Sequence, residues 1–234
     1  MNLIAFALGT VPDVETCRRL YDLGSLSDKD AAKVLYHRRK QETGYSEELR
    51  PNQQRLAALS LVREGIAGPE LISHTWRDGD EEALLDTLLS GCNGLASLIS
   101  WGSKQVPALG YRALKYGRRL PLPTHLRDLQ AELGQGQEAA MAPLHEVAHL
   151  LGLPGTHARC ADVWEDMLAD RTDKVQADLD LQALHIYLIA LRRAQIMQSR
   201  PAAQIGEACV ALRAHLSARQ EPHLVQFLDH WSAS

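Results

Sequence analysis

Apolar residues follow a strand pattern in four segments of the first half of the chain. Residues 3–8 form a continuous apolar run, which is typical of a strand covered on both faces. Residues 55–62 and 70–76 predict two paired strands, and the glycine-bearing turn at residues 65–68 between them fits a hairpin. Residues 95–101 predict a further buried strand.

Helical patterns separate these strands and fill the second half of the chain. Ser27 and the segment 78–80 provide polar residues that can cap helix starts. Everything after about residue 124 has a helical pattern. The predicted helices cover residues 13–23, 27–41, a leucine-rich segment after residue 80, 107–115, 173–198 and two segments between residues 201 and 231.

Strands in the first half and helices in the second predict one α/β unit. We expect a mixed β-sheet flanked by helices, because no low-complexity linker and no internal repeat divides the hydrophobic pattern. Residues 1–200 are assigned to this domain, and residues 201–234 to a helical C-terminal extension packed on it.

Composition narrows the class of protein. The 234 residues are 45% hydrophobic and carry a formal net charge of −4, which excludes a disordered chain and argues against a dedicated nucleic-acid coat. A local basic groove is still compatible with that charge. The four cysteines are far apart, as expected for thiols in a reducing compartment. Since no apolar run reaches the roughly 18 residues of a membrane span, we expect a cytoplasmic protein without membrane contact.

Several short motifs together resemble a known family. They are Thr-Val-Pro-Asp at residues 10–13, Ser-Trp at 100–101, Tyr-Arg-Ala-Leu at 111–114 and Leu-Leu-Gly-Leu-Pro-Gly at 150–155. In order and spacing they resemble a predicted 3′–5′ exonuclease family related to the proofreading domain of family B DNA polymerases. The resemblance covers essentially the whole chain and implies a ribonuclease H-like exonuclease fold.

The same resemblance implies a metal site that has lost its ligands. Such exonucleases hold two divalent metals with four acidic residues. The family's Asp-x-Glu falls on Ala7 and Gly9, and its second motif is shortened at residues 101–107, where Gln105 marks the missing aspartate. The third motif, Tyr-x-x-x-Asp, falls on Asp178 and Gln182. Alanine and glycine offer no oxygen to Mg²⁺ or Mn²⁺, so we expect no catalytic residue, metal or cofactor at these positions.

An alternative keeps weak, metal-dependent exonuclease activity with rearranged carboxylates. It would recruit Asp13, Asp128, Asp178 or Asp180. Asp13 and Asp178 are more simply interpreted as helix-end or surface carboxylates.

A rival of another class is a zinc metallopeptidase. His145-Glu146-Val147-Ala148-His149 matches H-E-x-x-H, in which both histidines share a helix face and grip Zn²⁺. No third ligand lies at the sequence spacing of known zinc peptidases. His157 is two residues beyond the expected position, and Glu165 matches no known spacing. Residues 152–155 also end the helix soon after the motif.

A chain that has lost its catalytic carboxylates is expected to act by binding. One hypothesis is single-stranded nucleic acid in the old cleft, held by Thr10, Trp101, Lys104 and Arg112, with Lys104 entering the vacated metal site. The other is a protein partner or self-association through the leucine-rich C-terminal helices. The acidic net charge favours the second.

Overall fold

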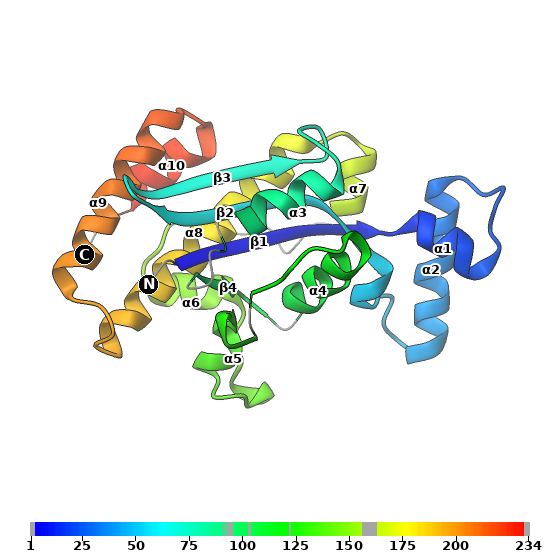
Figure 1. Ribbon diagram of the computed structural model, residues 1–234, viewed down its shortest axis with the longest axis horizontal. Helices are drawn as coiled ribbons and strands as arrows, with labels where there is room; N and C mark the ends of the chain where they lie inside the picture. The colour runs from blue at the N-terminus through cyan, green and yellow to red at the C-terminus, as the bar shows by residue number, and fades with distance from the viewer. Residues whose placement is uncertain are drawn as a thin grey trace.

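A five-stranded mixed sheet forms the centre of the molecule (Figure 1). The computed structural model describes residues 3–90, 92, 96–102, 104–121, 123–155 and 163–231. The strands lie in the order β3-β2-β1-β4-β5. They are β1 (Leu3–Pro12), β2 (Gln54–Gly65), β3 (Gly68–Thr75), β4 (Ser97–Ser100) and β5 (Leu126–Asp128).

Within the sheet, β2 is antiparallel to its two neighbours, β1 and β3. In contrast, β4 runs parallel to β1, and β5 runs parallel to β4. This arrangement confirms the predicted α/β fold, a mixed sheet flanked by helices, and is consistent with a ribonuclease H-like exonuclease. The predicted hairpin is confirmed as β2 and β3, with Gly65 paired to Gly68. Gly68 has φ +118°, a conformation that a side chain would strain.

Helices cover both faces of the sheet. The helices are α1 (Val14–Tyr21), α2 (Asp28–Thr43), α3 (Glu81–Ser90), α4 (Gln105–Tyr116), α5 (Leu129–Leu133), α6 (Leu144–Leu150), α7 (Val163–Leu168), α8 (Thr172–Ile196), α9 (Ala202–Arg219) and α10 (Pro222–His230). The short 3₁₀ turns are Pro51–Gln53, Pro123–His125 and Glu138–Ala140.

The sheet separates two hydrophobic cores, and successive side chains of β1 point alternately into one and the other. Phe6 and Leu8 pack with leucines of α3 and α4. Ala5 and Ala7 pack on the other face with α8, and that core continues through α9 and α10. Figure 1 shows α3 on the near side of the sheet, α8 behind it, and α1 and α2 beyond the end of β1.

Local capping explains where several helices begin. The Ser27 hydroxyl accepts a hydrogen bond from the Asp30 amide at the start of α2, and Asp80 accepts one from the Ala83 amide at the start of α3. Both caps lie where the sequence predicts them. Within the described residues, no helix is long and apolar enough to cross a membrane.

One prediction for the second half of the chain is wrong. Residues after 124 are not all helical, because Leu126–Asp128 form β5 at the edge of the sheet beside β4. A strand of three residues is too short to show a period. Its conformation comes from pairing with β4, a long-range contact that the local pattern does not report.

Candidate functional site

Ala7 and Gly9 occupy the face of β1 that α8 covers. Ala7 is completely buried in the core that includes α8. A Cβ atom built on Gly9 would lie 3.1 Å from the Ala58 Cβ, 3.2 Å from the Leu179 Cδ1 and 3.4 Å from the Val163 Cγ1. Gly9 is therefore surrounded by apolar side chains, whereas Ala7 pairs across the sheet with Ser60, whose hydroxyl donates to the buried Asp180.

The face of α8 that packs on β1 is also apolar. Leu179 and Ala183 are buried in this core, whereas Asp178 and Gln182 are only half-buried. The α8 residue that contacts Gly9, Leu179, thus lies one position after Asp178. Burial raises the pKa of Asp178, Lys174 opposes this effect, and Asp166 adds to it.

The residues of the shortened second motif are spread over different environments. Trp101 is half-buried and packs against the core on the α8 side. Gln105 begins α4. Lys104 does not enter the space near Ala7 and Gly9, because its exposed side chain forms an ion pair with Glu48. The role of Lys104 in replacing metal charge therefore stays a prediction.

Arg112 and Thr10 are engaged within the protein. The Arg112 guanidinium is 3% exposed and donates to Asp13 at 2.8 Å and to Glu81 at 2.6 Å. The Thr10 hydroxyl donates to the Gln54 side chain. Arg112 is therefore not open to a phosphate, in contrast to the role that the nucleic-acid hypothesis gives it.

This ion-pair network around Arg112 is a feature that sequence reasoning missed. Asp13 caps α1 through Thr16, and Tyr116 donates to Glu81 at 2.8 Å. Burial raises the pKa of Asp13, but hydrogen bonds from Thr16 and Arg112 outweigh it and hold that pKa below its usual value. Burial and Glu81 raise the pKa of Tyr116 to about 12. The network ties α1, α3 and α4 together.

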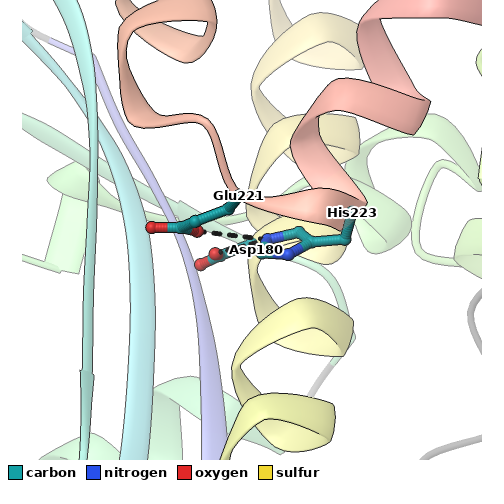
Figure 2. Close-up of side chains that lie close together, drawn as sticks. All are labelled: Asp180, Glu221 and His223. Carbon is teal, nitrogen blue, oxygen red and sulfur yellow. Dashed lines mark hydrogen bonds and ion pairs between the residues drawn. The ribbon is translucent and has the colours of Figure 1, made fainter.

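The acidic residues that a rearranged exonuclease would need are dispersed. Asp128 caps α5 and accepts from the Gly102 amide, and Asp13 belongs to the Arg112 network. Asp180, two residues after Asp178 on α8, accepts a hydrogen bond from Ser60 and lies beside Glu221 and His223 (Figure 2). Among the described residues, Asp13, Asp128 and Asp178 belong to no group of three potential metal ligands.

The H-E-x-x-H motif lies on α6, a helix of seven residues. His145, Glu146 and His149 are exposed. Over the part of the chain that the structure describes, these histidines have no third His, Cys, Asp or Glu within reach of a shared metal ion. His157, the third-ligand candidate, lies outside the described residues, and Glu165 is exposed at the start of α7.

An apolar groove of about 550 Å³ lies where α6, α8 and α9 meet. Its lining includes leucines from α8 and from the end of α6, together with Ile205, Val210 and Trp231, and two polar residues of α8, Arg192 and Gln195. Leu150 is 82% exposed and Val210 is 69% exposed at this groove. The leucine-rich C-terminal helices thus present apolar surface to solvent, as the protein-binding hypothesis requires.

Comparison with known proteins identifies part of the chain. Residues 122–231 match the model of a family described as a predicted 3′-5′ exonuclease related to the exonuclease domain of PolB. This match confirms the resemblance over α5 to α10, which includes the third motif and α6, and it does not extend to Ala7 and Gly9. No curated protein and no solved structure matches the chain.

Proposed function

We propose that this chain, whose residues 122–231 match a predicted PolB-related exonuclease family, is a non-catalytic member that acts by binding protein. The observation that carries the loss of catalysis is the packing at Gly9, where a side chain would meet Ala58 and Leu179 within 3.2 Å. Metal ions in such sites need several oxygen ligands and water. Apolar side chains from three segments fill that space instead.

Separate observations oppose the two enzymatic alternatives. A weak exonuclease would need carboxylates that converge on one point, and Asp13 and Asp128 are instead occupied with a buried arginine and a helix cap. For the zinc peptidase, the family match already accounts for the segment that contains His145 and His149. The exonuclease family therefore supports α6 as a structural helix.

Binding is assigned to the apolar groove at α6, α8 and α9. Lys104 forms a surface ion pair with Glu48, and Arg112 is buried with Asp13, so both cations expected to contact phosphate already have acidic partners. The groove offers exposed Leu150 and Val210. Its proposed occupant is a second copy of the chain, because pairing about a twofold axis would bury both side chains of each copy.

Catalysis is tested with 5′-labelled single- and double-stranded DNA and RNA in the presence of Mg²⁺ or Mn²⁺. We expect no shortening from the 3′ end above the enzyme-free control. Metal-dependent shortening that is lost in an Asp178→Asn variant would establish the rearranged exonuclease. Shortening that persists in that variant and in Asp13→Asn would indicate a contaminating nuclease, and repurification would remove it.

Self-association is tested by sedimentation equilibrium of the full chain. We expect a dimer that a Val210→Glu substitution shifts toward monomer, because a carboxylate would be buried at the interface. Val225→Glu is the matched control, since Val225 is 43% exposed on α10 and does not line the groove. A wild-type monomer at high micromolar concentration would refute a second copy as the occupant.

A further inference from the structure

Asp180, Glu221 and His223 bring three potential metal ligands together at the start of α10 (Figure 2). Asp180 comes from the middle of α8 and is completely buried. Glu221 and His223 flank the first residue of α10 and are half-buried. One ligand atom from each residue lies within 4.8 Å of the others.

The distances between these atoms suit a single ion. The His223 Nε2 lies 2.9 Å from the Asp180 Oδ2 and 3.5 Å from the Glu221 Oε2. Nitrogen and oxygen ligands bind Zn²⁺ at about 2.0–2.2 Å, which places neighbouring ligands of a tetrahedral ion about 3.3–3.6 Å apart. A small movement of the imidazole away from Asp180 would therefore open the position that an ion needs.

The second oxygen of each carboxylate is held by groups outside the cluster. The Asp180 Oδ1 accepts hydrogen bonds from the Ser60 and Ser73 hydroxyls of β2 and β3, each at 2.5 Å. The Glu221 Oε1 accepts two from the Arg219 guanidinium, at 2.7 and 3.0 Å. Outer hydrogen bonds of this kind orient ligands in metal sites. They leave the Asp180 Oδ2 and the Glu221 Oε2 directed toward the imidazole.

Asp180 has no lysine or arginine beside it. Among the described residues, no lysine or arginine forms an ion pair with Asp180, whose ion-pair partner is His223. A buried carboxylate is favoured by a compensating positive charge, which a divalent ion next to Oδ2 would supply.

We propose that Asp180, Glu221 and His223 bind one divalent transition-metal ion, with Zn²⁺ as the preferred ion. An imidazole with two carboxylates suits Zn²⁺ better than Mg²⁺, which prefers oxygen ligands. The side chains of His223 and Glu221 are 18% and 29% exposed, so water can complete the coordination. The ion would fasten α10 to α8 and, through Ser60 and Ser73, to the sheet.

The test uses the full chain after removal of metal with a chelator, followed by calorimetric titration with Zn²⁺. We expect one Zn²⁺ per chain and a higher unfolding temperature with Zn²⁺, because an ion that binds the folded state stabilises it. His223→Gln and Glu221→Gln should weaken binding more than about tenfold, at least as much as loss of an outer ligand partner. Both side chains are partly exposed, so these variants are expected to fold.

Two matched controls separate this site from others. His230→Gln removes an exposed imidazole from the same helix, α10, and should bind Zn²⁺ like the wild type. His145→Gln disrupts H-E-x-x-H and should also leave binding unchanged. Absence of Zn²⁺ binding by the wild type would overturn the proposal in favour of a metal-free His223–Asp180 ion pair. Binding that survives in His223→Gln but is lost in His145→Gln would assign the ion to α6.

Discussion

At Gly9 the backbone of β1 lies so close to α7 and α8 that even one added methyl group would be crowded. We expect Gly9→Ala to lower the free energy of unfolding by about 1–3 kcal/mol, the usual range for an extra methyl group in a packed core. The new Cβ would lie 3.1 Å from that of Ala58 and 3.2 Å from a Leu179 methyl group. Urea denaturation followed by circular dichroism measures this change.

Gly110→Ala is the matched control for Gly9. Gly110 lies within α4, and a Cβ there would have no atom within 4 Å. Since alanine favours a helix over glycine by about 0.5–1 kcal/mol, this variant should be more stable than the wild type. If Gly9→Ala were as stable as Gly110→Ala, the space beside β1 would be open, and the argument against a carboxylate at this position would fail.

At the same scale, some residues could be placed from sequence and others could not. Ala7 and Gly9 could be assigned because the family resemblance at residues 10–13 places Asp-x-Glu on them, and alternation along β1 sends both to one face. Arg112 could not, since its partners Asp13 and Glu81 are 99 and 31 residues away. A buried arginine has the same local pattern as an exposed one, and only the tertiary contacts distinguish them.

At the scale of elements, the hydrophobic period predicts the hairpin and the long helix α8 well, because each is long enough to repeat its pattern. It fails for β5, whose three residues are strand only because β4 lies beside them. The family's third motif, counted back from Tyr187, falls on Asp178, and the next residue, Leu179, is the one that packs beside Gly9. One residue along a helix is a rotation of about 100°, so these two side chains lie on different faces of α8.

The packing of the C-terminal helices on α8 can be tested at Phe227. Phe227 of α10 is 1% exposed, and its ring centre lies 6.0 Å from that of His185 on α8 and 5.6 Å from that of Trp231. We expect Phe227→Ala to cost about 3–5 kcal/mol, as for other buried aromatic residues. It should shift one cooperative transition, because α9 and α10 share the core beneath α8.

Val225→Ala on the same helix is the control for Phe227, because Val225 is 43% exposed. Its effect should stay within about 0.5 kcal/mol, as for most surface substitutions. Two separate transitions in the wild-type protein, with only one affected by Phe227→Ala, would mean that residues 201–234 unfold independently of the sheet. That result would contradict an extension packed on the same domain.

For the whole molecule, charge and apolar surface favour different partners. The formal net charge of −4 opposes long-range attraction of a polyanion. Lys104 and Arg112, on which the nucleic-acid hypothesis depends, are paired with Glu48, Asp13 and Glu81. The groove at α6, α8 and α9 is instead lined mainly by apolar side chains. Protein binding is therefore the hypothesis that the distribution of charge and burial supports.

This contrast predicts the outcome of a nucleic-acid titration. We expect that fluorescently labelled oligo(dT) and oligo(U) do not reach saturable binding at 150 mM salt with up to about 10 µM protein. That result would exclude the tighter end of the usual non-specific range, in which the Kd is about 10⁻⁴–10⁻⁶ M. Anisotropy measured between 50 and 200 mM salt gives the test. Each phosphate contact on a single strand contributes a slope of about −0.7 to log K against log salt.

A slope steeper than about −2 that Lys104→Glu reduces would show that Lys104 leaves Glu48 for phosphate, and would restore nucleic acid as the partner. A flat response, with no change in Lys104→Glu, would leave the apolar groove as the surface through which the chain acts.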